Sequence, residues 1–387
     1  MRSQKKGGCS KACACVNTMS YRGMAMKTFL SSVGVLKIAR RYYASRDCPC
    51  TSAPWDDWAG IPEGHKQTLC ARRMMTLVGT DFSFEEASEK LRELCRLDVS
   101  NDVIRAVCDE EGKSIMEWLE QVPESAEGIK NAAGELEFHT DGTMVNTTGG
   151  WREMRPGIFS RREPAAAATP EQRSDRVLNK PTARVAIADM ARSNVVGSAW
   201  ARMLEHLGLQ NTHRLSVLAD GARWIWDEAA KRFKLIAKVD WVVDVYHVAE
   251  HINDCAKKMF DPGPARKWGE EMVFELISLE GPAFIARLQG FRATLPGTDA
   301  RKALDGLIGY LSENRDSLWY RQRLAEGLPI GSGMVEGACK SVIGKRLKIN
   351  SARWRIKRAE HMAALRCLKY SSLWETYWES KSRKQAA

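Results

Sequence analysis

The pattern of hydrophobic and polar positions between residues 131 and 260 alternates between strand-like and helix-like segments. Short apolar or alternating runs, which are typical of β-strands, lie at residues 136–139, 150–162, 184–188, 213–218 and 234–239. Longer segments with apolar residues every three or four positions lie at residues 194–207 and 244–260, and this spacing predicts amphipathic helices. The sequence therefore predicts an α/β domain with five strands.

The predicted order is three strands, a helix, and then strand, helix, strand, helix. This is the order of a ribonuclease H-like core, in which the first and fourth strands lie side by side. We therefore expect Asp141, on the first strand, to be a neighbour of Asp220, at the end of the fourth strand. Residues 262–323 have a helical pattern without a strand signal, and we interpret them as a helical insertion.

A helical region precedes this core. Ser83 and Glu86 form a capping-box sequence that opens a helix ending near Leu97, and a second helix follows at residues 101–111. Two helices joined by so short a turn can form a helix-turn-helix that binds DNA, or a plain helical hairpin. Arg105 is the one basic residue in the first two turns of the second helix, which favours the hairpin.

The first fifty residues predict a β-hairpin between two pairs of cysteines. Residues 26–30 and 35–43 alternate like strands around a Ser-Ser-Val-Gly turn. Thiolates from two such pairs complete a tetrahedral site in a zinc ribbon, and the candidate Zn²⁺ ligands are Cys13, Cys15, Cys48 and Cys50. Each pair is separated by one residue instead of the usual two, so a metal-free basic hairpin is the alternative.

The net charge of +11 is concentrated near the two ends of the chain. Residues 1–46 carry ten Lys or Arg and no acid, and residues 340–369 carry ten Lys or Arg and one acid. Such blocks fit a polyanionic partner, usually nucleic acid, although a solvated basic surface is the alternative. The sequence has no secretory segment and no run long enough to span a membrane, and its eleven cysteines are too few for a disulfide scaffold. We expect a cytoplasmic, reduced protein that does not bind membranes.

Three acidic residues next to glycines are the strongest candidates for chemistry. Asp141 and Asp220 each precede a glycine at the end of a strand-like run, and Glu336 lies in a Gly-rich turn that leads into a helix. Cutting a phosphodiester commonly uses two divalent ions roughly 4 Å apart, and hard cations prefer carboxylate ligands. A single Asp-Gly pair is usually a turn. Three acids in these positions, on a chain with basic ends, predict a phosphoryl-transfer site for Mg²⁺ or Mn²⁺.

Two further features accompany these acids. Asp244 and His247 are three residues apart on one side of a predicted helix, so they can act together near a phosphate or hold each other in place. The segment after Glu336 surrounds an aromatic residue with basic ones, which indicates a helical surface facing DNA. The expected DNA-binding residues are Lys340, Lys345, Arg346, Lys348, Arg353, Trp354 and Arg355.

These features divide the chain into five predicted regions. They are a basic, ribbon-like DNA-binding segment at residues 1–60, a helical segment at 61–130 that contains the hairpin or helix-turn-helix, the ribonuclease H-like core at 131–260, the helical insertion at 261–325, and the last catalytic helix with basic C-terminal helices at 326–387.

Five motifs in order resemble those of bacterial insertion-sequence transposases of the ISKra type. They are Asp141-Gly-Thr, Ala219-Asp-Gly-Ala-Arg-Trp-Ile-Trp, Asp244-x-x-His247, Ile330-Gly-Ser-Gly-Met-Val-Glu336, and Lys345-Arg-Leu-Lys followed by Arg353-Trp354. The likeness extends from about residue 25 to Trp378. It implies a DDE transposase in which Asp141, Asp220 and Glu336 are the metal-binding triad. It also implies that Asp244 and His247 match the aspartate–histidine signature that follows the second acid in several such families.

The resemblance implies double-stranded DNA as the partner, both element ends and target, with the protein acting as a homo-oligomer associated with the nucleoid. The sequence departs from the family in its cysteine spacing and at residues 350–352, where a glycine usually precedes the Arg-Trp pair. Two other functions need the same acids. One is a transposase-derived DNA-binding protein without strand transfer, and the other is a nuclease of the same fold that cuts without joining.

Overall fold

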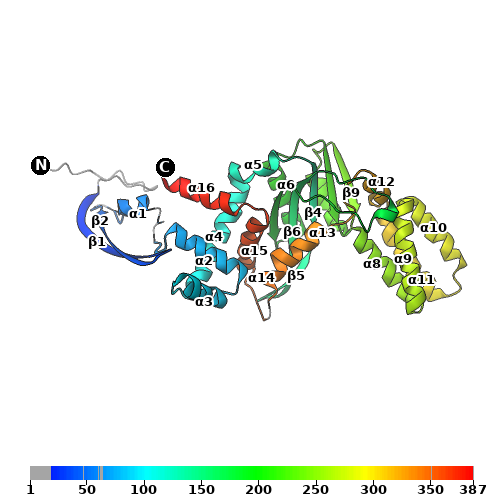
Figure 1. The fold of residues 1–387 in the computed structure, drawn as a ribbon, viewed down its shortest axis with the longest axis horizontal. Helices are drawn as coiled ribbons and strands as arrows, with labels where there is room; N and C mark the ends of the chain where they lie inside the picture. Colours follow the sequence, from blue (N-terminus) through cyan, green and yellow to red (C-terminus); the bar gives the residue numbers. More distant parts are fainter. Residues whose placement is uncertain (1–18, 47, 60, 62–63, 350, 387) are drawn as a thin grey trace. The chain divides into compact units, whose positions relative to one another are not determined.

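The computed structural model describes residues 19–386 except 47, 60, 62–63 and 350. The chain divides into two compact units, one formed by residues 1–114 together with 374–387 and the other by residues 115–373 (Figure 1). None of the helices in the described part of the chain is long and apolar enough to cross a membrane. The C-terminal residues thus belong to the same unit as the N-terminal residues, whereas the predicted divisions grouped them with the segment that starts at residue 326.

A β-hairpin opens the described part of the first unit. β1 (Ser20–Ser31) pairs antiparallel with β2 (Gly34–Ala44), and the short β3 (Thr51–Ser52) pairs with the end of β2. Gly34 follows the turn with φ +113°, a conformation that favours glycine. The hairpin lies where the alternating pattern predicted it.

The candidate zinc ligands divide between described and undescribed residues. Cys48 and Cys50 lie half-buried in the connection between β2 and β3. Cys13 and Cys15 lie outside the described residues. Zinc binding by the four cysteines therefore stays a prediction.

The short helix α1 (Pro54–Trp58) and three longer helices follow: α2 (Leu69–Asp81), α3 (Phe84–Cys95) and α4 (Asn101–Gln121). The predicted capping box is present at the start of α3, since the Glu86 amide donates to Ser83 Oγ at 3.2 Å and the Ser83 amide donates to Glu86 Oε2 at 2.9 Å. α4 is ten residues longer than predicted. Its buried positions continue past Gly112 to Ile115 and Leu119 at helical spacing, so a single glycine does not end it.

A buried carboxylate holds the C-terminal helix α16 (Trp374–Ala386) in the first unit. Glu111 has no exposed surface, and it accepts a hydrogen bond from Tyr377 Oη at 2.7 Å. Its oxygens also pair with Arg72 at 2.7 Å and with Lys381 at 2.5 Å. A buried charge without partners costs several kcal/mol, so these three contacts are needed for Glu111 to be tolerated.

The second unit is built on a six-stranded mixed sheet, so the protein is of the α/β class. The strands are β4 (Glu135–Thr140), β5 (Thr143–Thr147), β6 (Gly150–Arg162), β7 (Ala183–Asp189), β8 (Arg214–Ala219) and β9 (Lys238–Val243). β6 pairs antiparallel with β4, β5 and β7, and β4, β8 and β9 run parallel to one another. The strands that end before Asp141 and Asp220 are therefore neighbours, as expected.

Two strands differ from the prediction. β5 has no predicted counterpart, because its five residues are polar apart from Met144 and Val145. The last strand is not at residues 234–239 but at β9, four residues later. The apolar pair at residues 235–236 lies in the connection before β9, and the strand contains Asp240, whose charge is balanced by Arg214 on the adjacent β8.

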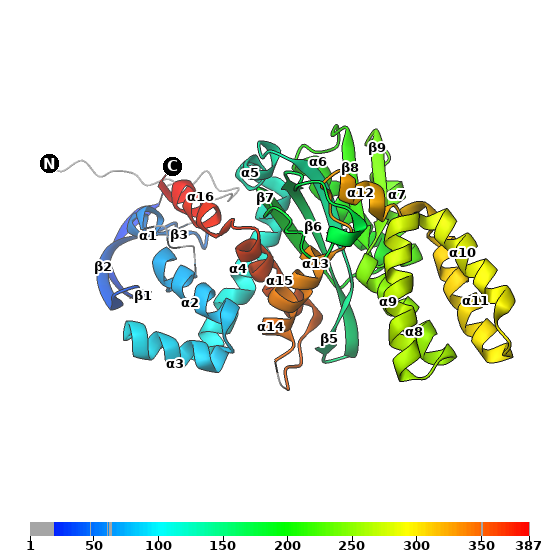
Figure 2. The ribbon, with the colours of Figure 1, turned by 45° about the vertical axis from the view of Figure 1, so that its right-hand side comes forward.

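The two faces of β4 carry different side chains, because successive residues of a strand point to opposite faces. The ring of Phe138 packs 5.0 Å from that of Trp200 in α6 (Ser193–His206) and 5.1 Å from that of Phe233, which follows α7 (Arg223–Arg232). The next residue, His139, points to the other face and lines a cavity with residues of α13 (Gly333–Ala338). The helix that carries Glu336 thus covers the face of the sheet opposite to α6 and α7 (Figure 2).

A group of helices follows β9. α8 (Val245–Met259) corresponds to the helix predicted at residues 244–260, and the region predicted as a helical insertion at 261–325 contains α9 (Pro262–Leu279), α10 (Gly281–Thr294), α11 (Thr298–Glu313) and α12 (Tyr320–Ala325). Their apolar faces form a core that includes Ile252, Leu276, Phe284 and Leu311, all fully buried. Figure 1 shows α8–α11 gathered at the β9 end of the sheet.

The chain then returns to the sheet through α13. A π-helical turn at residues 339–344 and α14 (Lys345–Leu347) continue α13, and α15 (Ile356–Tyr370) packs against β7. Glu336 is in the first turn of α13, as predicted. π-Helical turns are rare and frequently lie at functional sites.

Two residues expected to face DNA are instead buried. Trp354 is 8% exposed, its amide donates to the Asn146 carbonyl at 3.0 Å, and its indole Nε1 donates to the Leu347 carbonyl at 3.1 Å. Arg346 is 2% exposed and its guanidinium lies 5.0 Å from the centre of the Trp354 ring. Arg346 and Trp354 are therefore not exposed toward a DNA partner in this structure, because the Trp354 backbone bonds to β5 and its ring packs on Arg346.

This structural role predicts different costs for adjacent substitutions. Trp354→Ala should lower the free energy of unfolding by about 3–5 kcal/mol, since it removes a large buried side chain, and the thermal midpoint should fall by about 6 °C or more. Arg355→Ala, at an exposed neighbour, should leave the midpoint within about 2 °C of wild type. Equal midpoints for the two variants, measured by calorimetry, would contradict this assignment.

Candidate functional site

Asp141 and Asp220 lie at the ends of adjacent parallel strands. His139 of β4 pairs with Leu218 of β8, so the same register two residues further places Asp141 opposite Asp220. Both carboxylates are only partly exposed. Neighbouring strands are about 4.8 Å apart, so this edge of the sheet brings the two acids close together.

Asp244 extends the row to a third strand. Ala219 of β8 pairs with Val243 of β9, so Asp244 follows β9 as Asp220 follows β8. Its side chain is buried, caps α8 by accepting from the Tyr246 amide at 2.8 Å, and accepts from the Ser332 amide at 3.0 Å and from the Ser332 hydroxyl. The hydrogen bonds of Asp244 thus go to Tyr246 and Ser332, so its side chain links the start of α8 to the turn before α13.

The environment of Asp141 disfavours its charged form. Burial raises the pKa of Asp141, and the nearby carboxylates of Asp220 and Asp244 raise it further. The Gly142 amide, which donates to Asp141 Oδ1 at 2.6 Å, and the His247 ring act in the opposite direction. A nearby positive charge would therefore stabilise the ionised form of Asp141.

Glu336 belongs to the same neighbourhood, but its carboxylate has another partner here. It is 55% exposed and pairs with Lys340 at 2.5 Å. Cys339, three residues later on the same helical face, has its thiol 3.9 Å from Asp141 Oδ2, and burial followed by Asp141 raises the pKa of that thiol to about 12. Among the described residues, no three His, Cys, Asp or Glu side chains are close enough together to hold a metal ion. The structure thus brings Asp141 and Asp220 together and places the helix of Glu336 beside them.

The helical insertion fixes the loop after Asp220. Tyr310 Oη in α11 donates to the Asp220 carbonyl at 3.1 Å. Gly221 has φ +90°, and a β-carbon at this position would lie 3.2 Å from both Tyr310 Oη and Asn314 Oδ1. Only glycine fits this close contact well. No sequence signal identified Tyr310 or Asn314, because Tyr310 lies 90 residues beyond Asp220 and Asn314 lies 88 residues beyond its partner Trp226.

The glycine after Asp141 lies against an acid of β6. A β-carbon on Gly142 would lie 2.0 Å from Oε1 of Glu153, which also pairs with Arg155 at 2.5 Å. The space beside this glycine is therefore taken by Glu153, which no local sequence signal marked.

A second pair of acids lies at the same edge of the sheet. β7 and β4 are both antiparallel to β6, so Asp189 at the end of β7 emerges on the same side as Asp141. Glu360 of α15 lies beside it and accepts from the Met190 amide at 3.4 Å. Burial, together with the charge of Asp189, raises the pKa of Glu360 to about 7. Asp189 follows an apolar strand, and this was the signal that could have found it.

The exposed basic residues near α13 and α14 are fewer than predicted. Arg346 and Trp354 are buried, so the exposed members of the predicted DNA-binding set are Lys340, Lys345, Lys348, Arg353 and Arg355. Lys348 Nζ contacts Thr143 Oγ1 on β5, the strand that follows Asp141. Positive charge therefore lies near the strand that begins directly after the acids.

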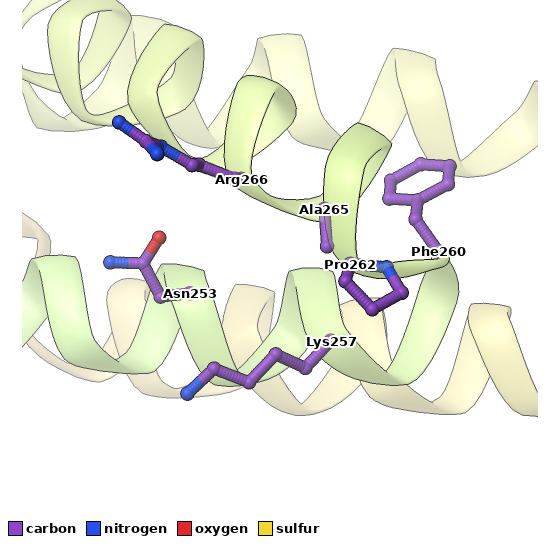
Figure 3. Close-up of a pocket in the computed structure, with 6 residues that line it drawn as sticks. All are labelled: Asn253, Lys257, Phe260, Pro262, Ala265 and Arg266. Atoms are coloured by element: carbon purple, nitrogen blue, oxygen red, sulfur yellow. The ribbon is translucent and has the colours of Figure 1, made fainter.

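Two cavities lie outside the row of aspartates. One, of about 540 Å³, opens between α8 and α9 and is lined by Asn253, Lys257, Phe260, Pro262, Ala265 and Arg266 (Figure 3). The other, of about 390 Å³, lies behind α13 and is bordered by His139, Arg162, Arg184, Gly333 and Gly337 among others. None of the predicted catalytic acids lines either cavity.

The Glu360 environment predicts a pH-dependent effect on stability. Because its folded pKa is raised from about 4.5 to about 7, the protonated form favours the folded state, and this contribution is lost as pH rises through about 7. Glu360→Gln should therefore raise the thermal midpoint at pH 8 and change it little at pH 4.5. Glu375→Gln, at an exposed acid, is the control. If Glu360→Gln shifted the thermal midpoint equally at both pH values, the link between the raised pKa of Glu360 and stability would be contradicted.

Comparison with known proteins places the chain in a family. A family model described as an uncharacterised protein family, UPF0236, matches residues 19–381. None of the curated proteins compared with the chain matches it. The match covers both compact units and includes Asp141, Asp220 and Glu336. The chain therefore belongs to the uncharacterised protein family UPF0236.

Proposed function

We propose that the protein is a DDE transposase, an enzyme that cuts DNA at element ends and joins the cut strands to a target. The observation that carries the proposal is the pair Asp141 and Asp220 at the ends of adjacent parallel strands, with the Glu336 helix beside them. The strand order β7-β6-β4-β8-β9, antiparallel and then parallel, supports the further proposal that this sheet is a ribonuclease H-like core.

The residues present fit Mg²⁺ or Mn²⁺. Asp141, Asp220 and Glu336 offer only carboxylate oxygens, the ligands that hard cations prefer. Burial raises the pKa of Asp141, and the neighbouring charges of Asp220 and Asp244 raise it further, so a cation beside it would stabilise its charged form. When bound, two such ions would activate the attacking oxygen and stabilise the charge that develops on the leaving oxygen.

The protein's own residues then have separate tasks. Asp141 and Asp220 hold their carboxylates at a fixed edge of the sheet, and Tyr310 restrains the loop after Asp220. Glu336 completes the set by leaving Lys340. Exposed ion pairs with this helical spacing contribute only about 0.3–0.5 kcal/mol. Breaking the pair with Lys340, so that the Glu336 carboxylate can turn toward an ion beside the aspartates, therefore costs little.

Asp244 has a positioning task in this account. Its bonds to Ser332 fix the turn from which α13 starts, and the Val245 amide donates to the Ile330 carbonyl at 3.1 Å nearby. Through these contacts the end of β9 determines where Glu336 begins its helix. This is a different role from the joint action of Asp244 and His247 on a phosphate that the sequence suggested.

Positive charge supports a DNA substrate. The exposed Lys345, Lys348, Arg353 and Arg355 lie in the segment that follows α13, and Lys348 reaches the strand after Asp141. In the first unit, the hairpin exposes Arg22, Lys37 and Arg41 among others. Each such side chain that neutralises a phosphate releases counterions, so these residues supply affinity without requiring a particular sequence.

The two alternative functions differ from a transposase in the DNA products that they would form. A nuclease of the same fold would nick or linearise DNA without joining, and a DNA-binding protein derived from a transposase would do neither. The test substrate is a supercoiled plasmid that carries the DNA flanking the gene, incubated with the protein and Mg²⁺ or Mn²⁺. Joined products support the transposase.

The catalytic acids predict a separation of chemistry from binding. Asp220→Asn and Glu336→Gln should each lower cleavage and joining by at least about 10³-fold, since each removes a ligand charge from the proposed site. Both variants should shift DNA in a gel as wild type does. Asp227→Asn, at an exposed acid on α7, should keep full activity. Normal joining by Asp220→Asn would remove the basis of the proposal.

The basic segment predicts a change in salt dependence. Lys345→Ala combined with Lys348→Ala should reduce the slope of log affinity against log salt by about 2, because each phosphate contact contributes about 0.9 to that slope. Lys257→Ala, on α8 and paired with Asp254, should leave the slope unchanged. If the double variant keeps the wild-type slope in fluorescence anisotropy titrations, these lysines do not contact DNA.

A further inference from the structure

Two histidines on α8 form a cluster that the proposed chemistry does not use. His247 and His251 are one helical turn apart, and their Nε2 atoms lie 3.3 Å from each other. The His247 side chain is 37% exposed and His251 is also exposed, so both nitrogens can be reached from solvent. Without an ion, one ring can donate its Nε2 proton to the other.

The distance between the two nitrogens matches that of a metal chelate. Two imidazole nitrogens, each about 2.0–2.1 Å from one Zn²⁺ and separated by the tetrahedral angle, are about 3.3–3.4 Å apart. Two histidines at positions i and i+4 on one helical face are a recurrent zinc-binding arrangement. The separation of the two nitrogens is therefore the one that a shared metal ion requires.

Each ring has a neighbour that bears on its state. The Oε2 atom of Glu250 lies 3.7 Å from Nδ1 of His247, beyond hydrogen-bond distance, and its charge on that side favours a proton on Nδ1, which leaves the Nε2 lone pair for a ligand. The ring of His251 stacks on that of Tyr310 with centres 4.1 Å apart and an angle of 23°. Rings held in this way lose less conformational entropy on binding than freely rotating ones.

We propose that His247 and His251 form a binding site for a divalent transition-metal ion of the Zn²⁺, Co²⁺, Ni²⁺ and Cu²⁺ class, separate from the carboxylate site for hard cations. Two protein ligands leave further positions to water or to an oxygen of a substrate. Imidazole nitrogen selects these ions over Mg²⁺, and the affinity should follow the order Co²⁺, Ni²⁺, Cu²⁺ with Zn²⁺ below Cu²⁺.

The location connects such an ion to the loop that follows Asp220. Tyr310 contacts His251 with its ring and the Asp220 carbonyl with its hydroxyl, so one side chain joins the histidine pair to the loop of the second aspartate. The site does not depend on the proposed transposase function, and its test uses no DNA.

The test is titration of the full-length protein with Co²⁺, followed by visible absorption, and with Zn²⁺, followed by calorimetry. Wild type, His247→Ala, His251→Ala and His213→Ala are compared, the last being an exposed histidine outside α8. Cobalt bound by cysteine thiolates has sulfur-to-metal charge-transfer bands, so the difference spectrum between wild type and the His251 variant isolates the imidazole site.

We expect wild type and His213→Ala to share one binding step that weakens at least about tenfold in each of the other two variants. Tyr310→Phe, which keeps the stacked ring, should retain the step, and Tyr310→Leu should weaken it. Thermal midpoints check that every variant is folded. The proposal is overturned if the α8 variants bind as wild type does, or if Asp141→Asn, and neither histidine substitution, removes the step.

Discussion

The parallel register of β4, β8 and β9 is the constraint on which the second unit depends. Each of these strands is followed directly by an aspartate, and the pairing brings Asp141, Asp220 and Asp244 into one row. Like charges held this close raise the energy of the folded protein unless they are bonded or bind a cation. The three aspartates meet this constraint in different ways, and their separate roles follow from it.

The carboxylate of Asp244 has several hydrogen-bond donors within the protein, whereas that of Asp141 has few. Asp244 accepts bonds from Tyr246 and Ser332, so its charge is used to join α8 to the turn before α13. Asp141 receives one backbone amide and a weak thiol contact, and its pKa is raised. Acids whose pKa is shifted by burial and by a second carboxylate cluster at functional sites, which supports the proposed cation site.

Some of this arrangement was accessible from the sequence. The Asp-Gly pairs after apolar runs at Asp141 and Asp220 marked strand ends, because an apolar run that stops at a turn sequence is a local signal. Glu336 was recognisable for the same reason, since glycines precede it and a helix follows. The hairpin and the Ser83 cap are also local features, and both are present.

The rest depends on contacts between distant residues. β9 was misplaced because the apolar residues 235–236 outweighed a strand that contains Asp240, whose charge is balanced by Arg214 and other basic residues. Trp354, surrounded by basic residues, resembled a base-stacking residue, but its backbone joins β5 and its ring covers Arg346. Tyr310 contacts the Asp220 loop from about ninety residues away, and no local pattern reports such a contact.

The most direct test of the account is a crystal structure of the protein grown with Mn²⁺ and measured at a wavelength where manganese scatters anomalously. The account predicts anomalous density about 2.0–2.3 Å from carboxylate oxygens of both Asp141 and Asp220, with Glu336 turned from Lys340 toward the same ion. Manganese bound elsewhere, in a protein that still cuts DNA and leaves both aspartates without an ion, would contradict it.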